Sequence, residues 1–328
     1  MRWTLVTEDF PPNFIGGIAT WVYELASALH EQGESVCVFA RKTKNCHTFD
    51  AQAPFPIYRM YGRSWAKYKS LWVKLALLRH KTEILLFANW ELATKITPST
   101  NGNRMWVAAH GSDITRPGIH LPSLKSMVPK VEYWLPVSQY LKGILHRYIG
   151  QQSYVVIPMP IPIAPSPTVF RADKPLLLIA RKTPFKGIDA SLSLAQQLKR
   201  PLWIIGHNGS DTGWVRYLGT LSLRDTRKTI SQSAAVLLLS QTDSKGFFGE
   251  GLGLSLLEAA AEGVIGIGSQ TGGIPEAIGP GLVIDPSKPN LDEIESALCD
   301  PTRGVAAWKW IQKNHGKERA VSALRKLR

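Results

Sequence analysis

Short apolar runs alternate with longer amphipathic stretches along most of the chain. In the first half, helical spacing predicts a helix over Gly17–Gln32. The apolar runs predict strands over Trp3–Thr7, Ser35–Ala40, Ile84–Ala88, Met105–Ala109, Tyr133–Val137 and Tyr154–Ile157. Strands rich in Val, Ile and Leu that alternate with helices are typical of a parallel sheet covered on both faces. The first half is therefore predicted to be a doubly wound α/β domain.

A proline-rich segment interrupts this alternation. Five prolines fall within ten residues, namely Pro158, Pro160, Pro162, Pro165 and Pro167. Because proline lacks an amide hydrogen and fixes φ, such a segment continues neither a helix nor a central strand and stays extended. We interpret it as an interdomain linker.

Beyond the linker the alternation resumes. Strands are predicted over Leu176–Ala180, Leu202–Ile205, Val236–Leu239, Val264–Ile267 and Leu282–Ile284, and helices over Ile188–Lys199, Leu223–Ser233, Leu254–Glu262 and Leu291–Leu298. We expect two Rossmann-like domains, over residues 1–160 and 161–307, that face each other across a cleft. A C-terminal helix over 308–328 could pack back on the first domain. Ligands of such folds bind at the carboxyl ends of strands and in clefts between domains.

Composition narrows the class of protein. The chain has 328 residues, 44% of them hydrophobic, and 11 Trp, 10 Phe and 9 Tyr, which fits two folded domains and excludes a disordered chain. Cys37, Cys46 and Cys299 form no paired motif, which favours a reducing compartment. No window resembles a membrane span, and Glu8 and Asp9 interrupt the position of a signal-peptide core. We expect a cytoplasmic protein, soluble or peripheral on the inner face of the membrane.

The net charge is strongly positive. Lys and Arg number 39 against 25 Asp and Glu, which gives +14. Such a surplus predicts attraction to polyanions, whether nucleic acid, anionic lipid or a sugar-nucleotide diphosphate. Residues 1–160 hold 18 basic and 10 acidic residues, so both halves share the excess. Because the aromatic residues are not part of a recognisable RNA-binding motif, we do not expect nucleic acid as a partner.

The most informative stretch lies in the second half, over residues 246–263. Glu250 and Glu258 stand eight residues apart, and Gly249, Gly251 and Gly253 surround the first of them. Glycines let a backbone approach a ligand closely, and the helix predicted to follow would present its first amides to an anion. A carboxylate there could accept hydrogen bonds from vicinal sugar hydroxyls. An amphipathic helix with solvated glutamates explains the same pattern equally well.

Two cations follow a predicted strand of the second half. Arg181 comes directly after the strand, and Lys186 follows five residues later. Such cations could neutralise a diphosphate, Arg through its planar fork and Lys as a point charge. The chain contains no Asp-x-Asp pair to hold Mg²⁺, so no metal is expected and the protein cations would do that work. The alternative is an ordinary polar loop with solvated charges.

Two features of the first half follow predicted strands. Gly16 and Gly17 begin the first predicted helix, where a phosphate or an acceptor group could lie against exposed backbone. His110 stands where another strand ends, directly before Gly111. A plain turn and a structural histidine are the respective alternatives.

Taken in order, these motifs resemble glycosyltransferase family 4, a family of retaining enzymes with the two-domain GT-B fold. The resemblance covers nearly the whole chain. The motifs are Pro11, Pro12, Gly16 and Gly17; His110, Gly111 and Asp113; Val137 and Ser138; Arg181, Lys186 and Gly187; Tyr217, Leu218 and Gly219; Glu250 and Glu258; and Gly272 to Glu276. The chain departs from the family pattern at Ile157–Ile161, where an Asn-Gly-x-Asp sequence is usual, and at Ala180, where a glycine is usual.

The resemblance implies a retaining, metal-independent transfer of a sugar from a nucleotide diphosphate, a UDP- or GDP-sugar, to a hydroxyl acceptor without a cofactor. Attack on the same face, assisted by the departing phosphate, is the mechanism that it suggests. It implies catalytic roles for His110, Arg181, Lys186 and Glu250, and donor binding by Gly16, Gly17, Arg181, Lys186, Gly253, Leu254, Ser255 and Glu258. In particular, Arg181 and Lys186 would hold the diphosphate, Glu250 the donor sugar and Glu258 the ribose.

A basic stretch without acidic residues extends from Arg59 to Lys81 and includes Lys67, Lys69 and Lys74. Its aromatic and aliphatic residues recur at helical spacing. One interpretation is a membrane-surface helix whose lysines face anionic headgroups. The interpretation we favour is a helix that packs on the first sheet and keeps its lysines in solvent. As a hypothesis, those lysines help to attract a lipid-linked or cell-surface glycan acceptor.

Other functions remain open from the sequence. A sugar-nucleotide epimerase shares the two-domain architecture but does not call for the two spaced glutamates. A non-catalytic protein that binds nucleotide sugars would fit the charge. A dinucleotide-dependent dehydrogenase is disfavoured because no predicted strand leads into a Gly-x-Gly-x-x-Gly turn.

Overall fold

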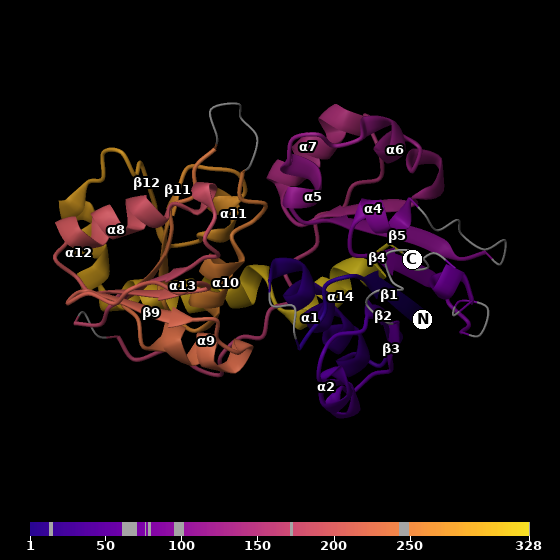
Figure 1. Ribbon diagram of the computed structural model, residues 1–328, viewed down its shortest axis with the longest axis horizontal. Helices are drawn as coiled ribbons and strands as arrows, with labels where there is room; N and C mark the ends of the chain where they lie inside the picture. The colour runs from indigo at the N-terminus through magenta and orange to yellow at the C-terminus, as the bar shows by residue number, and fades with distance from the viewer. Residues whose placement is uncertain are drawn as a thin grey trace. The chain divides into compact units, whose positions relative to one another are not determined.

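The computed structural model describes residues 1–12, 16–60, 71–75, 77, 80–94, 102–170, 173–242 and 249–327. They divide into two compact units (Figure 1). The first unit contains Met1–Pro160 and Gly316–Arg328, and the second contains Ile161–His315. The first passage between the units therefore falls at Pro160, inside the proline-rich segment.

The first unit is built on a six-stranded parallel sheet with the order β3-β2-β1-β4-β5-β6. Its strands are β1 (Arg2–Thr7), β2 (Ser35–Arg41), β3 (Ile57–Met60), β4 (Ile84–Phe87), β5 (Arg104–Ala109) and β6 (Tyr133–Pro136). Its helices are α1 (Gly17–Glu31), α2 (Cys46–Gln52), α4 (Trp90–Ala93), α5 (Ser112–Thr115), α6 (Leu121–Lys125) and α7 (Gln139–Ile149), with a short 3-10 turn at Val128–Lys130. Residues 71–75 are also helical.

One predicted strand of this unit is wrong. Within the segment Tyr154–Ile157, only Tyr154 pairs, in a single bridge with Trp134. The prolines that follow lack the amide hydrogens that a longer ladder would need. Conversely, β3 escaped prediction because it is a short edge strand whose residues are all half-buried.

The second unit is built on a six-stranded parallel sheet with the order β12-β11-β10-β7-β8-β9. Its strands are β7 (Leu176–Ile179), β8 (Leu202–Ile205), β9 (Val215–Gly219), β10 (Ala235–Leu238), β11 (Ile265–Ser269) and β12 (Leu282–Ile284). Its helices are α8 (Ile188–Gln197), α9 (Leu223–Ser231), α10 (Leu254–Ala261), α11 (Ile274–Ala277), α12 (Leu291–Cys299) and α13 (Pro301–Asn314), with a 3-10 turn at Pro184–Lys186. The predicted α/β class with two doubly wound parallel sheets is confirmed.

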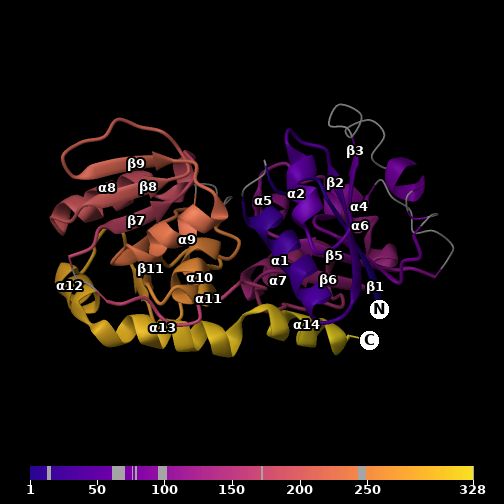
Figure 2. The same ribbon diagram turned by 90° about the horizontal axis from the view of Figure 1, so that it is seen from below.

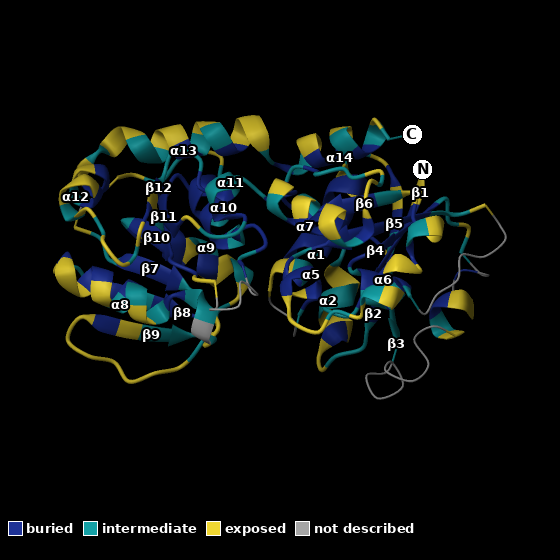
Figure 3. Ribbon diagram, turned by 90° about the horizontal axis from the view of Figure 1, so that it is seen from above, coloured by how far each residue is buried: buried dark blue, intermediate teal, exposed yellow. Residues whose placement is uncertain are grey.

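Helices cover both faces of the second sheet. Leu178 and Ile267 share one buried cluster with Leu194 of α8 and Ile294 of α12. On the opposite face, α10 and α11 approach β11 so closely that a Cβ on Gly268 would lie 2.5 Å from the Ile274 side chain. Figure 3 shows the result, with buried strands inside and exposed residues on the outer faces of the helices. A sheet covered in this way leaves its strand ends as the places where polar groups can gather.

The C-terminal segment differs from the single helix predicted over 308–328. It forms α13 and then α14 (Lys317–Arg325), because His315 is extended and Gly316 adopts φ +103°, a region that favours glycine. α14 packs against α1 within the first unit (Figure 2). No helix among the described residues is both long and apolar enough to cross a bilayer.

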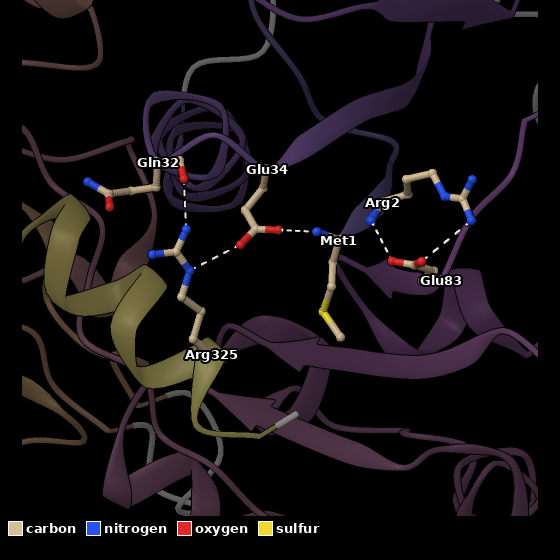
Figure 4. A network of polar contacts seen from close by, with 6 residues as sticks. All are labelled: Met1, Arg2, Gln32, Glu34, Glu83 and Arg325. Atoms are coloured by element: carbon tan, nitrogen blue, oxygen red, sulfur yellow. Dashed lines mark hydrogen bonds and ion pairs between the residues drawn. The ribbon is translucent and has the colours of Figure 1, made fainter.

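Polar contacts hold α14 in place. Arg325 donates from Nε to the Glu34 carboxylate at 3.0 Å and from its terminal nitrogen to Gln32 O at 2.7 Å (Figure 4). The other oxygen of Glu34 lies 2.5 Å from the Met1 amino group. Because the Glu34 side chain is only 4% exposed, its charge depends on these partners.

Candidate active site

In the second unit, the segment after β7 carries the two predicted phosphate-binding cations. All strands of the sheet are parallel, so their carboxyl ends share one edge. Arg181 leaves β7 at this edge and is exposed, whereas Lys186 ends the 3-10 turn and is half-buried. The turn is fixed against the end of β10, because Gln241 donates its amide hydrogen to Phe185 O at 2.9 Å.

Gly187 is required for this placement. It adopts φ +65°, and a Cβ there would lie 1.9 Å from the Leu239 carbonyl oxygen. No other residue could bring the backbone so close to β10 without displacing one of the two segments. The glycine after Lys186 therefore has a structural reason as well as its place in the family motif.

The structure brings Lys186 together with Glu250, which is 64 residues away in sequence. Lys186 Nζ lies 2.5 Å from Glu250 Oε2, and the two side chains are 19% and 16% exposed. Arg181 forms no hydrogen bond or ion pair with any described residue. The result is a cation and a carboxylate in contact near the carboxyl edge, with a second cation exposed after β7.

The Glu250 backbone is held by the Gly-Gly-Ile-Pro-Glu turn. Gly273 donates its amide hydrogen to Glu250 O at 2.8 Å. Gly272 has φ +60°, and a Cβ there would lie 2.2 Å from the same oxygen. Two motifs that the sequence shows separately are thus one packed unit, in which the second positions the first.

α10 begins directly after this loop. Its N-cap residue, Gly253, adopts φ +98°, and Leu254 and Ser255 form the first helical positions. Glu258 lies one turn further on and is half-buried. The amides of the first turn and the two spaced glutamates therefore belong to one continuous loop and helix, and free amides at a helix start can bind an anion.

In the first unit, His110 follows β5 directly and packs on α1. Its ring meets Trp21 edge to face with centroids 4.8 Å apart. Nε2 is buried and has no hydrogen-bond partner among the described residues. Burial lowers the pKa of His110 to about 3, so the ring is neutral at physiological pH.

Asp113 fixes the turn that carries His110. Its Oδ1 accepts the amide hydrogens of His110 at 3.0 Å and Gly111 at 2.8 Å. Burial raises the pKa of Asp113 to about 6, although these two hydrogen bonds oppose the shift. Gly111 adopts φ +139°, which the turn requires.

Gly16 and Gly17 lie at the start of α1, the helix that carries Trp21. A Cβ on either glycine would meet nothing within 4 Å. Packing among the described residues therefore does not explain them, unlike Gly187 and Gly272. Open space beside a helix start suits a bound group.

The sequence reasoning missed His207, which follows β8 at the same edge as Arg181. Its Nδ1 lies 3.0 Å from the Ala180 carbonyl oxygen, and its ring contacts Tyr217 with centroids 5.5 Å apart. The sequence does contain a pattern that could have predicted it. Gly206 and His207 follow an apolar run, just as His110 and Gly111 follow another. Asp113 was predicted only as part of the His-Gly-x-Asp motif, because the residues beside it in sequence do not show that it is buried.

The basic stretch is only partly described. Lys67 and Lys69 lie outside the described residues. Arg59 is not a surface charge, because it lies 2.7 Å from Asp50 and its side chain is 5% exposed. Lys74 is exposed, as are Leu71 and Leu75 at 56% and 51%.

The inner side of this short helix packs on the first sheet. Val73 is fully buried, and the Trp72 ring lies 5.3 Å from that of Phe39 in β2.

Among the described residues, no group of His, Cys, Asp and Glu is arranged to hold a metal ion.

Comparison with known proteins follows the same division of the chain. The family described as Glycosyltransferase Family 4 matches residues 15–164, and that described as Glycosyl transferases group 1 matches residues 165–301. A GDP-mannose-dependent monoacylated alpha-(1-6)-phosphatidylinositol monomannoside mannosyltransferase of Corynebacterium glutamicum is 24% identical and covers 92% of this chain and 90% of its own length. The O-antigen chain mannosyltransferase B of Escherichia coli is 30% identical over 36% of this chain and 29% of its own length.

Solved structures share the fold over the whole chain. Anabaena HepE, in complex with UDP and glucose, has a TM-score of 0.77 at 13% identity and covers 100% of this chain and 98% of its own. AviGT4, a glycosyltransferase involved in avilamycin A biosynthesis, has a TM-score of 0.72 at 18% identity, with 99% and 96% covered. Together with the two family matches, which span residues 15–301 without a gap, these likenesses show that the chain belongs to glycosyltransferase family 4, has the GT-B fold and is a glycosyltransferase.

Proposed function

We propose that this enzyme transfers mannose from GDP-mannose to a hydroxyl group of a lipid-linked or cell-surface glycan, with retention of anomeric configuration and without a metal. The observation that carries the proposal is the contact between Lys186 and Glu250 near the carboxyl edge of the second sheet. It joins a diphosphate-binding cation to a sugar-binding carboxylate in one site. The second unit is then the donor side and the first unit the acceptor side.

In this proposal, the second unit binds the whole donor. Arg181 and Lys186 hold the diphosphate and stabilise the charge that grows on the leaving group. Glu250 accepts hydrogen bonds from hydroxyls of the donor sugar, and Glu258 from those of the ribose. The first amides of α10, at Gly253, Leu254 and Ser255, support the distal phosphate.

The proposal also assigns roles to residues of the first unit. His110 has a catalytic role in this proposal, in which a hydrogen bond from its uncharged ring positions the donor sugar without adding charge. Gly16 and Gly17 bring backbone close to a phosphate or to the acceptor. The acceptor hydroxyl attacks on the face from which the diphosphate leaves, and the departing phosphate takes its proton.

The choice of GDP-mannose is supported by the sequence relatives. Both are mannosyltransferases, and one is GDP-mannose-dependent by name. The HepE structures with UDP or UDP-glucose are 13–14% identical to this chain, and their likeness is one of fold. The donor proposal therefore follows the relatives whose sequences match.

The first experiment measures thermal unfolding with UDP, GDP, ADP, dTDP and GDP-mannose. We expect GDP and GDP-mannose to raise the melting temperature and the other compounds to do so less, since a ligand stabilises by its occupancy. A larger shift with UDP would contradict the choice of nucleotide, and no shift with any compound would contradict the donor site. Transfer to a glycan acceptor in excess EDTA, with the anomer of the product assigned by NMR, tests the metal-independent and retaining parts.

Membrane contact by the first unit is a separate part of the proposal. Leu71, Lys74 and Leu75 are exposed on one short helix, so two apolar side chains flank a cation. Such a surface suits the headgroup region of an anionic bilayer, where a lipid-linked acceptor would be found. We expect Leu71→Ser/Leu75→Ser to reduce co-sedimentation with vesicles that contain phosphatidylglycerol. Equal sedimentation with purely zwitterionic vesicles would count against the anionic surface.

A further inference from the structure

Ala180, the residue before Arg181, has both its amide and its carbonyl group held by residues of β8 and the segment after it. Ala180 donates its amide hydrogen to Ile205 O at 2.9 Å, which continues the ladder between β7 and β8. Its oxygen lies 3.0 Å from His207 Nδ1. Because a carbonyl oxygen can only accept a hydrogen bond, Nδ1 carries the proton in this contact.

The backbone around His207 is shaped for the same oxygen. Gly206 adopts φ +109°, and a Cβ there would lie 2.5 Å from Ala180 O. The His207 ring is steadied in turn by Tyr217, which packs against it edge to face and also lies against the backbone of Gly209. Two consecutive residues after β8 are therefore fitted to one carbonyl group at the end of β7.

The direction of the Arg181 side chain depends on this backbone. Arg181 is exposed and makes no hydrogen bond or ion pair with the described residues, so no contact of its side chain with them fixes its direction. What fixes it is the course of the chain from Ala180 onward. A change in the orientation of that peptide group would swing the guanidinium at the end of a long side chain.

We propose that His207 is a positioning residue of the donor site, which holds the Ala180 carbonyl and so directs Arg181 towards the donor diphosphate. The inference rests on the proposed role of Arg181. It assigns to His207 a part in donor affinity that does not require contact with the donor. Its imidazole acts through one hydrogen bond, from Nδ1.

Three variants at position 207 separate the hydrogen bond from the rest of the ring. In His207→Asn, the amide nitrogen takes the place of Nδ1, two bonds from Cβ. In His207→Gln, the amide nitrogen lies one atom further out, and His207→Ala has no donor. We expect His207→Asn to keep kcat/KM for GDP-mannose within about 2-fold, and the other two to lower it by about 3- to 10-fold, the effect of one hydrogen bond. The loss should lie in the KM for the donor.

A double-mutant cycle with Arg181→Ala provides the decisive readout. If His207 acts through Arg181, His207→Ala should change kcat/KM by less than about 2-fold in the Arg181→Ala background. Full additivity, with Arg181→Ala itself strongly impaired, would overturn the positioning role and leave the proposed donor site intact. An Arg181→Ala variant with unchanged donor affinity would instead overturn the assignment of Arg181, and this inference with it. Thermal unfolding of every variant checks the fold, and His207→Gln replaces His207→Ala in the cycle if the latter does not fold.

Discussion

The ammonium group of Lys186 and the carboxylate of Glu250 lie 2.5 Å apart, although the residues come from different strand-to-helix connections. Both side chains are mostly buried, so the pair is shielded from solvent more than a surface ion pair is. In the proposed site, a donor diphosphate bound to Lys186 would share this cation with Glu250, and the carboxylate would turn part of its hydrogen-bonding capacity to the sugar.

Replacing Lys186 should weaken donor binding. We expect Lys186→Met, which keeps the length of the side chain and removes its charge, to raise the KM for the donor at least about 10-fold, since charge-assisted hydrogen bonds contribute about 1.5–3 kcal/mol each. Initial rates over a range of donor concentrations give the value. Lys288→Met, at an exposed position in the same unit, is the matched control and should leave the KM unchanged.

Glu250 should matter most for the transfer itself. Glu250→Gln keeps the shape of the side chain, and Glu250→Ala removes it. We expect a loss of kcat of about 100-fold for the glutamine variant, the size typical of one preorganised polar group, and no measurable transfer for the alanine variant. The exposed Glu293 supplies the control as Glu293→Gln. Wild-type turnover in Glu250→Ala would refute the assignment.

The turn at Gly272 should be as important as the residue that it supports. Gly272→Ala places a Cβ 2.2 Å from Glu250 O, so the loop that carries Glu250 must shift. We expect reduced transfer together with a lower melting temperature. Gly33→Ala is the comparison, because Gly33 also has positive φ but its Cβ would meet nothing within 4 Å. If both variants behave alike, backbone strain alone explains the effect and the contact with Glu250 has no role.

Asp113 should make stability depend on pH in an identifiable direction. Its folded-state pKa of about 6 lies above the ordinary value of 3.8, so its contribution is fully present below about pH 4 and is lost as pH rises to 6 and beyond. The difference between these two pKa values corresponds to a change of about 3 kcal/mol in the free energy of unfolding. Urea unfolding of the wild type and Asp113→Asn at several pH values measures it, because the other groups cancel in the comparison.

The expected result is that Asp113→Asn gains stability relative to the wild type between pH 4 and 7. His110, whose pKa is lowered, acts in the opposite sense and destabilises as pH falls below 6.5, but it is present in both proteins. A difference that stays constant over this range would show that Asp113 is not buried as a carboxylate.

Arg325 should contribute more to stability than its position near the chain end suggests. Arg325→Ala removes one cationic partner of the buried Glu34 carboxylate, at a cost of about 1–3 kcal/mol. Arg2→Ala is the control, since the side-chain contact of Arg2 with Glu83 is 3.4 Å long and both groups are more than 40% exposed. Chemical unfolding should therefore shift for the first variant and hardly for the second.

The sequence predicted most of the fold because buried parallel strands carry long apolar runs. Leu202–Ile205 and Leu282–Ile284 coincide with β8 and β12 at both ends. The strands β3 and β9 escaped because they lie at sheet edges and their residues are largely half-exposed, which removes the apolar signal. The strand predicted at Tyr154–Ile157 has the right residues but runs into prolines.

The candidate site could be predicted residue by residue but not as an arrangement. Lys186 and Glu250 each stood out, yet nothing in the spacing shows that they touch, because the contact depends on the order of strands in the sheet. The raised pKa of Asp113 comes from its burial in the folded chain, which the local sequence does not predict. His207 follows an apolar run, but its hydrogen bond is to a backbone atom, which no side-chain motif predicts. The family assignment excludes the epimerase, which shares only the two-domain architecture, and the dehydrogenase, which the sequence already disfavoured.

The return of α14 to the first unit affects the order in which the protein can fold during synthesis. Residues 317–325 are made after the whole second unit, yet they cover α1 near the beginning of the chain. The first unit cannot bury this face of α1 until α14 has been made. Until then, the α1 surface that α14 covers and the Glu34 carboxylate that Arg325 contacts remain without these partners, although α1 is among the first elements to be made.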